Sequence, residues 1–339
     1  MNYATGFIEF LKPSTIYRHC FRPRKAKNLN LDNKKVLITG GNRGIGLETV
    51  KYITEFADNT TVTVCARSDF EEQAENLSNE YVKVDHVKLD LSDLESISET
   101  VKQLFEKHQY FDVVICNAGI MHDGQSFDSG FINGVESCFL VNHLGHFSFV
   151  NQVLNKLNSS GQIVPERVVI VSSTGHYFCG NFGIDVDDIS ISSKTHPYRN
   201  WKSFMYYTQS KAANIYHVKS LSEKLPLSFV HAVHPGCVNT DISGNVFRLG
   251  FTKPLFELFK KIVLRSPFYG IQTTIHAAFS ENKKVVKKSG CYFENCRRKE
   301  PASCISDDVK KEKLWEYSVR MTGVDLGIES VHKIVNPKV

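Results

Sequence analysis

Apolar runs of strand length alternate with helix-length segments along most of the chain. The runs are rich in Val and Ile, which is typical of strands buried on both faces of a parallel sheet. We predict strands at Val36–Thr39, Thr61–Ala66, Val82–Leu89, Asp112–Cys116, Arg167–Ser172 and Ser228–Val233, and a further short apolar piece at Gly290–Phe293. We predict helices at Gly44–Phe56, from Ser92 with Glu95 at capping-box spacing, and around 131–157, 203–224, 271–280 and 307–320. This alternation predicts an α/β fold in one domain, a doubly wound parallel sheet of Rossmann type.

Two stretches depart from the alternation, at 178–202 and 239–268. Both follow predicted strands, and an open α/β sheet binds its ligand beyond the carboxyl ends of its strands. We expect a substrate loop at 178–202 and a water-excluding lid at Leu255–Leu264, an amphipathic segment between two prolines. The alternative for Leu255–Leu264 is an ordinary helix packed on the core. We place the domain at 34–328, a leader at 1–33 and a C-terminal tail at 329–339.

The net charge of +5 is concentrated at the start of the chain. The first 35 residues hold eight Lys and Arg against two acidic residues, whereas the rest is nearly neutral. Apolar side chains at Tyr3 and at 7–11 lie beside this charge, which predicts peripheral contact of residues 1–35 with an anionic membrane surface. The alternative is a solvated tail whose small apolar end docks on the domain of this same chain. The basic stretch lacks a recognisable nucleic-acid-binding module, so we expect no nucleic-acid partner.

Composition and cysteines indicate the compartment. A hydrophobic content of 42% and a charged content of 23% exclude collagen-like chains and argue against wholesale disorder. Glu9, Lys12 and Pro13 interrupt the apolar start, so we expect no secretory signal. Nine scattered cysteines, several in apolar runs, predict buried free thiols in a reducing compartment, and none has metal-site spacing. We therefore expect no metal. We expect a protein that is not secreted, on the cytoplasmic side, peripherally at the endoplasmic reticulum or another intracellular membrane.

The strand–turn–helix at Thr39–Gly46 predicts a dinucleotide site. Glycines allow close approach of the backbone to a pyrophosphate, and the helix start offers free N–H groups. The candidate residues are Gly40, Asn42, Arg43, Gly44, Ile45 and Gly46. After the second strand stands Arg67, with no acid before Asp69 to bind ribose hydroxyls. Arg43 and Arg67 suit a 2′-phosphate, which favours NADP(H) and leaves NAD(H) as the alternative.

Tyr207 and Lys211 stand four residues apart in a helical segment, so their side chains project from one face. An unperturbed phenol has a pKa of about 10. A neighbouring ammonium favours the phenolate form and brings proton transfer within reach at neutral pH. Tyr198 and Lys202 have the same spacing but lie in the irregular stretch. We therefore expect Tyr207 and Lys211 to be the catalytic pair, with Lys211 also bonding the nicotinamide ribose.

Hydroxyl and amide side chains end two further predicted elements. Ser172 and Ser173 close a buried strand, where a serine can donate to a developing alkoxide. Adjacent strand residues face opposite ways, so we expect only one of them to reach the site. Asn117 and Asn142 are candidates for the same region, with structural hydrogen bonding as the alternative.

Together these segments resemble the short-chain dehydrogenase/reductase family, from about residue 34 to 325. Within that resemblance, Asn142, Ser173, Tyr207 and Lys211 match the catalytic tetrad. The family's cofactor contacts match Thr39–Gly46, Asp90, Leu91, Asn117, Ala118, Gly119, Tyr207 and Lys211, and a loop with Pro235, Gly236, Val238 and Thr240.

Segments within the chain resemble particular branches of the family. Val141–Phe147 and Leu314–Ser318 resemble the retinol dehydrogenases, whereas Val171–Tyr177, Gly236–Ile242 and Met321–Val324 resemble the X-linked dehydrogenase/reductase relatives. The resemblance implies hydride transfer between NADP(H) and an apolar alcohol or its aldehyde or ketone, such as a retinoid or a polyisoprenoid. It also implies a homodimer formed through the helices at 131–157 and 203–224, with a monomer as the alternative.

The resemblance assigns each tetrad residue a role in reduction. Tyr207 protonates the carbonyl oxygen, Ser173 polarises it, Lys211 tunes the tyrosine, and Asn142 supports a relay to the lysine. Two other functions stay open at this point. One is a catalytically silent NADP-binding regulator or scaffold, and the other is a reductase of small carbonyl compounds.

Overall fold

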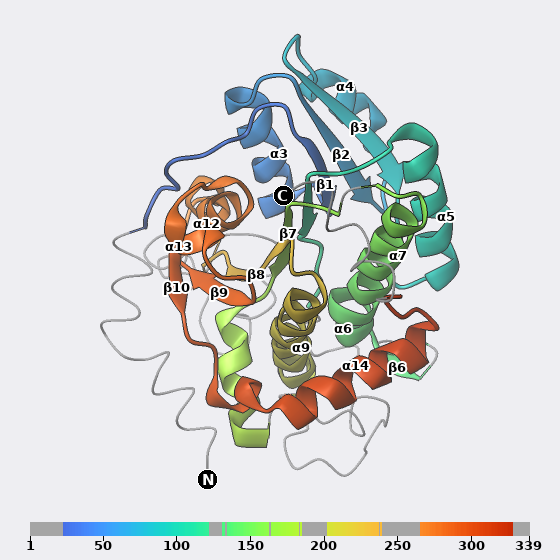
Figure 1. Cartoon of the computed structure of the whole chain (residues 1–339), viewed down its shortest axis with the longest axis vertical. Coiled ribbons are helices and arrows are strands. Elements are labelled where there is room, and N and C mark those ends of the chain that lie inside the picture. The colour runs from blue at the N-terminus through green and yellow to red at the C-terminus, as the bar shows by residue number, and fades with distance from the viewer. Residues whose placement is uncertain are drawn as a thin grey trace, which may run out of the picture.

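A single mixed sheet organises the chain in a computed structural model that describes residues 23–121, 131–132, 134–162, 164–182, 184, 202–236, 238 and 265–327. Its eight strands follow the order β10-β9-β8-β7-β4-β1-β2-β3 (Figure 1). All neighbours are parallel except β9 and β10. The strands are β1 Lys35–Thr39, β2 Thr60–Ala66, β3 Val82–Lys88, β4 Val113–Cys116, β7 Arg167–Val171, β8 Phe229–His234, β9 Cys291–Glu294 and β10 Arg297–Lys299. The predicted Rossmann-type fold is confirmed.

The strand order reverses direction between β1 and β4. The chain runs outward from β1 through β2 to β3, returns to β4 on the other side of β1, and continues to β7, β8 and β9. At such a reversal the helices that follow the two central strands leave on opposite faces, which opens a crevice at the carboxyl ends of β1 and β4. The topology therefore puts the ligand crevice at Thr39 and Cys116.

Helices cover both faces of the sheet (Figure 1). On one face α3 packs against α12, and on the other α5 packs against α7 beside α9. A further helix, α14, packs on α7 and α9 as an additional layer. The helices are α3 Gly44–Phe56, α4 Glu71–Leu77, α5 Leu94–Lys107, α6 Ser137–Phe139, α7 Gly145–Ser159, α9 Lys202–Lys224, α12 Pro267–Phe279, α13 Lys283–Val286 and α14 Asp308–Thr322, with 3-10 helices at Thr174–Phe182 and Ser303–Ser306.

The alternation of side chains along the strands divides the core into two clusters. Ile38 packs in the cluster that contains Ile53 of α3 and Ile271 of α12. Leu37, its neighbour in β1, belongs to the other cluster with Leu104 of α5. Because both faces of each central strand are buried, the strand sequences are continuous apolar runs, which explains why the sequence located them well.

The predicted helix at 131–157 is wrong in its first part. Phe131–Ile132 (β5) and Val135–Glu136 (β6) form an antiparallel hairpin, and α6, a π-helical turn at Leu140–Leu144 and α7 follow it. In the sequence Asn133 precedes Gly134, a dipeptide that is a strong hairpin signal, and Gly134 has a φ of +79°. Turn chemistry therefore overrides an apolar spacing that also fits a helix.

The predicted start of α5 is displaced by one residue. Asp93, not Ser92, is the N-cap, and its carboxylate accepts from the amides of Glu95 and Ser96. The Ser92 hydroxyl instead donates to Asp90 Oδ1 at 2.6 Å. A carboxylate is an equally good cap, so two adjacent capping residues left the sequence pattern ambiguous.

Part of the basic leader packs on the domain beside α12. The amide of Ala26 donates to Gln272 Oε1, Leu29 forms a β-bridge with Ser280, and the Ser280 hydroxyl donates to the Lys27 carbonyl. Leu31 is buried. The described residues include no helix long and apolar enough to cross a bilayer.

Candidate active site

The glycine loop after β1 has no space for larger side chains. A Cβ on Gly46 would collide with the carbonyl oxygen of Gly40 and lie 2.5 Å from Asn117 Nδ2. Gly40 and Gly44 have φ values of +65° and +55°, which favour glycine. The N-cap residue of α3, Arg43, makes no side-chain cap hydrogen bond with the first turn of the helix. This cradle fits the pyrophosphate of a dinucleotide.

Asn117 and Thr39 fix the shape of this loop. The Asn117 amide donates to the carbonyls of Thr39 and Gly40 at 3.0 and 3.2 Å. Thr39 Oγ1 accepts from the main-chain amides of Asn117 and Ala118 at 3.0 and 3.1 Å. The Asn117 side chain therefore supports the loop.

The two candidate arginines lie on neighbouring loops, after β1 and after β2. Both Arg43 and Arg67 are exposed. Asn42 Nδ2 donates to Ser68 Oγ at 2.7 Å, which ties the two loops together. Asp69, the nearest acid after β2, accepts from the amide of Glu71 at the start of α4. The loop after β2 thus contains the exposed Arg67 and, two residues later, Asp69, whose carboxylate accepts the hydrogen bond from the Glu71 amide.

The other cofactor candidates lie in α3 and after the strands β3 and β8. Ile45 is half-buried against the α3–α12 core. Asp90 is half-buried after β3 and accepts from Ser92, and Leu91 is buried. Gly236 follows β8 with a φ of +91°, and Val238 bridges to Arg265. Thr240 and Leu255–Leu264 lie outside the described residues, as do Tyr198 and most of the 178–202 loop.

Lys211 brings a buried ammonium to the catalytic end. Its Nζ donates to the carbonyl of Val171 at 3.1 Å and lies 5.7 Å from the centroid of the Tyr207 ring. Burial lowers the pKa of Lys211 to about 8. Near neutral pH this ammonium can stabilise a phenolate and also release a proton. The predicted proximity of Tyr207 and Lys211 is present in the structure.

Ser173 lies close to the Tyr207 ring. A Cβ placed on Gly175 would be 3.4 Å from both Ser173 Oγ and Tyr207 Cε1, so the hydroxyl and the ring flank one point. The Gly175 amide donates to Ser173 Oγ at 3.0 Å, which holds the hydroxyl in place. Ser172 instead donates to the Lys211 carbonyl at 2.7 Å. Of the two serines, Ser173 is the one whose hydroxyl shares this point with the Tyr207 ring.

Asn142 lies within the π-helical turn and fixes the neighbourhood of Lys211. Its side chain accepts from the amide of Ile120 at 2.8 Å and donates to the Ile120 carbonyl and to Ser210 Oγ, both at 3.0 Å. A Cβ on Gly119 would be 3.2 Å from Asn142 Oδ1 and 3.4 Å from Lys211 Nζ. Glycine at 119 thus allows the amide and the ammonium to approach one another. π-helical turns are frequent at functional sites.

Two polar residues of the site were not found from the sequence. Asn214 Nδ2 donates at 3.1 Å to the Val171 carbonyl that also accepts from Lys211. His146 contacts both Thr39 and the carbonyl of Asn142. Asn214 follows Lys211 by three residues on α9, a helical spacing that could have indicated it. No local signal marks His146, because its partner Thr39 is 107 residues away in sequence.

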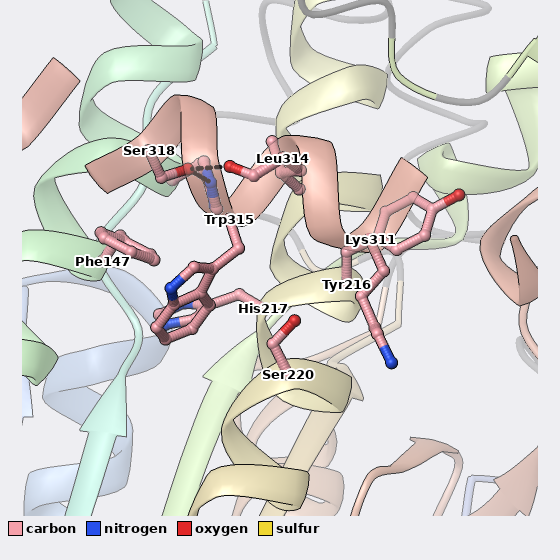
Figure 2. Close-up of a pocket in the computed structure, with 9 residues that line it drawn as sticks. Phe147, Tyr216, His217, Ser220, Lys311, Leu314, Trp315 and Ser318 are labelled. Atoms are coloured by element: carbon pink, nitrogen blue, oxygen red, sulfur yellow. Dashed lines mark hydrogen bonds between the residues drawn. The ribbon is translucent and has the colours of Figure 1, made fainter. Parts of the chain in front are cut away.

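A separate buried cluster joins α14 to α7 and α9 (Figure 2). Phe147, His217 and Trp315 meet there, and His143 Nε2 bonds Ser318 Oγ at 2.9 Å. The side chains leave no room for a water molecule between them. Burial lowers the pKa of His143 to about 3 and that of His217 well below its usual value. In this cluster the side chains of α7, α9 and α14 pack directly against one another.

Comparison with known proteins identifies the family of this chain. The family model described as short chain dehydrogenase matches residues 34–182. Retinol dehydrogenase 13 of Homo sapiens is 32% identical over 315 residues, which cover 89% of this chain and 88% of that protein. Retinol dehydrogenase 14 of Mus musculus is 31% identical over 308 residues, which cover 87% of each.

Solved structures share the fold. An uncharacterized protein from Mycobacterium paratuberculosis superposes with a TM-score of 0.65 at 22% identity, covering 90% of this chain and 99% of that one. The Pseudomonas aeruginosa protein RhlG, in an NADP active-site complex, superposes with a TM-score of 0.57 at 20% identity, covering 79% and 96%. At these identities the likeness concerns the fold alone.

Proposed function

The chain belongs to the short-chain dehydrogenase family, in its retinol-dehydrogenase-like branch, and is an NAD(P)-dependent oxidoreductase of alcohols and carbonyls. From this premise we propose that it interconverts an apolar alcohol and its aldehyde or ketone with NADP(H). One observation carries the proposal. The buried ammonium of Lys211 lies 5.7 Å from the centroid of the Tyr207 ring, and Ser173 Oγ and Tyr207 Cε1 are each 3.4 Å from the position of a Cβ on Gly175.

The residues at the catalytic end divide the work of carbonyl reduction. Bound NADPH supplies the hydride that adds to the carbonyl carbon. Tyr207 donates its phenolic proton to the carbonyl oxygen, while the Ser173 hydroxyl donates a hydrogen bond to that oxygen as negative charge develops. Lys211 stabilises the phenolate that remains and returns a proton to it. Asn142 keeps the Gly119–Ile120 segment beside the ammonium and supports its proton supply.

The residues of the glycine cradle would hold the cofactor. The amides at the start of α3 would bind the pyrophosphate, and the 117–119 segment would line the ribose side. Pro235 and Gly236 lie at the end of β8, where the nicotinamide would bind. Arg43 and Arg67 would bind a 2′-phosphate, since both are exposed on loops joined by the Asn42–Ser68 hydrogen bond. This arrangement favours NADP(H), with NAD(H) as the alternative.

The apolar substrate class is proposed from the relatives. Two proteins similar over most of this chain are named retinol dehydrogenases. We take retinoids and polyisoprenoid aldehydes as the first substrates to test, and short carbonyl compounds as the competing class. A catalytically silent NADP-binding regulator is the other competing function, and the buried Lys211 beside Tyr207 argues against it.

NADPH oxidation tests the enzyme proposal directly. We expect wild type to oxidise NADPH with retinal or a polyprenal faster than with short aldehydes. Tyr207→Phe should lower turnover about 100-fold or more while NADPH still binds, because it removes the proton donor. Tyr216→Phe is the matched control, since that phenol is on the same helix but donates to the Cys304 carbonyl. Equal turnover in wild type and Tyr207→Phe would refute the assignment.

The leader is proposed as a peripheral membrane contact on the cytoplasmic side of the endoplasmic reticulum or another intracellular membrane. Its basic and apolar residues support this proposal. The test is co-sedimentation with anionic liposomes of the full chain and of a chain lacking residues 2–22. The deletion ends there because residues 24–31 pack beside α12. Equal pelleting of both proteins would reject the leader's role.

For the oligomeric state, the packing of α14 on α7 and α9 favours the monomer over the homodimer. The homodimer would pair the helices at 131–157 and 203–224. In this chain α14 packs on α7 and α9, with Trp315 4.8 Å from the Phe147 ring and a hydrogen bond between Ser318 and His143. A partner subunit would have to displace this buried layer.

A further inference from the structure

His146 lies between the glycine loop and the catalytic end of the site. Its ring is 1% exposed and stands at the start of α7, four residues after Asn142. Nε2 is 2.8 Å from Thr39 Oγ1, and Nδ1 is 3.1 Å from the carbonyl oxygen of Asn142. One imidazole thus connects the last residue of β1 to the π-helical turn.

The surrounding hydrogen bonds determine which atom donates and which accepts in each of the two hydrogen bonds of His146. Thr39 Oγ1 already accepts from the amides of Asn117 and Ala118, which occupy its two lone pairs. Its O–H must therefore donate to His146 Nε2, which makes Nε2 the acceptor. The ring proton is then on Nδ1 and donates to the Asn142 carbonyl. Burial lowers the pKa of His146 to about 4, so this neutral tautomer persists at physiological pH.

On the Asn142 side, the hydrogen-bond network of His146 reaches the ammonium of Lys211. The Asn142 side chain forms two bonds with Ile120 and a third with Ser210. Its Oδ1 and Lys211 Nζ converge on the space above Gly119. The Thr39 end reaches the glycine loop, because Asn117 bonds both Thr39 and Gly40. His146 is the buried side chain that bonds both Thr39 and Asn142.

We propose that His146 is a positioning residue, which links the conformation of the glycine loop to Asn142 and, through Asn142, to the placement of Lys211. The inference rests on the proposed function, because it concerns the geometry of the same reaction. A fully satisfied buried network holds its members in one arrangement, and loss of a central member releases both ends.

Three variants separate the two bonds of His146. His146→Asn places an amide near the Nδ1 position and retains a donor toward the Asn142 carbonyl. His146→Gln extends an amide toward the Nε2 position and retains an acceptor for Thr39. His146→Phe fills the space without either bond. Each full-length protein is assayed for kcat and KM with NADPH and retinal, and for the Kd of NADPH by fluorescence.

The proposal predicts a split between kcat and substrate KM. His146→Phe should lower kcat about tenfold and change KM for retinal by less than about twofold, because no contact with substrate is removed. His146→Asn should recover most of kcat, and His146→Gln should recover NADPH affinity and not kcat. Wild-type kcat in His146→Phe, or equal recovery by Asn and Gln, would overturn the proposal.

His231→Phe is the matched control for removing a buried histidine. His231 is also buried and has a pKa of about 4, and it bonds the Val285 carbonyl away from the site. We expect it to lower thermal stability and leave kcat unchanged. A parallel loss of kcat in His231→Phe would mean that the effect at His146 is general destabilisation.

NADPH binding reports on His146 without turnover. His146→Phe should raise the Kd of NADPH about fivefold in the wild-type background, and by less than about twofold in a Thr39→Val background, where the link is already broken. Additive effects would refute the link. If the wild-type protein binds NADPH but reduces no carbonyl, the proposed function is refuted. The double-mutant cycle of His146→Phe and Thr39→Val would still decide the role of His146.

Discussion

Gly46→Ala tests whether the glycine loop is the cofactor cradle. The added Cβ would collide with the Gly40 carbonyl oxygen and lie 2.5 Å from Asn117 Nδ2 and 2.8 Å from the Gly40 carbonyl carbon. These neighbours cannot move easily. The Gly40 amide donates to the Cys65 carbonyl at 2.8 Å, and the Asn117 amide is fixed by two main-chain acceptors.

The size of the effect follows from this crowding. Overpacking of a tight site costs about 1–3 kcal/mol. If the loop is displaced to relieve the contact, NADPH binding must restore it, and the same free energy weakens affinity. Since 1.4 kcal/mol corresponds to about tenfold in Kd, we expect the Kd of NADPH to rise about tenfold to a hundredfold.

Fluorescence titration measures this Kd, and urea unfolding measures stability in the same samples. Gly327→Ala is the control, because no atom lies within 4 Å of a Cβ at that position. We expect it to bind NADPH like wild type. A Gly46→Ala protein that is folded and has wild-type affinity would refute the cradle.

Three further predictions concern cofactor choice, acid stability and assembly. Arg67→Asp should weaken NADP(H) binding at least about tenfold more than NAD(H) binding, measured by paired titrations, and an unchanged preference would contradict the 2′-phosphate site. His143 protonates near pH 6.5 when unfolded and at about 3 when folded, so stability should fall as pH drops below about 6.5. By pH 4 that histidine alone should cost about 3 kcal/mol, and a urea midpoint equal at pH 4.5 and 7 would contradict this. Light scattering should give a monomer of 38.4 kDa, whereas a stable dimer with Trp315 still buried would reject the role of α14.

The sequence predicted the fold, and the proximity of Tyr207 and Lys211, for physical reasons. The strands are buried on both faces, so continuous Val and Ile runs mark them clearly. Tyr207 and Lys211 occupy one face of a long helix, α9, and their spacing is a local signal. The position of Ser173 was predicted only through the family resemblance, since strand alternation left Ser172 as an equal candidate.

Other features depend on contacts between distant segments. The hairpin at 131–136 was missed because Phe131, Ile132 and Val135 also fit a helical spacing. The His146–Thr39 contact joins residues far apart in sequence, and no periodicity records it. The arrangement of α14 over α7 and α9 likewise depends on tertiary packing. The predictions for Thr240 and for the lid at Leu255–Leu264 concern residues outside the described part of the chain.

Isotope transfer gives the most direct test of the central claim that this site couples hydride transfer to proton donation by Tyr207. Wild type is incubated with retinal and with NADPH that carries deuterium at both C4 positions. The product alcohol is examined by mass spectrometry, and Tyr207→Phe is assayed in parallel. We predict one deuterium at the former carbonyl carbon in wild type and at least about 100-fold slower incorporation in Tyr207→Phe. Alcohol formed without deuterium from NADPH labelled on both C4 positions, or equal rates in the two proteins, would contradict the account.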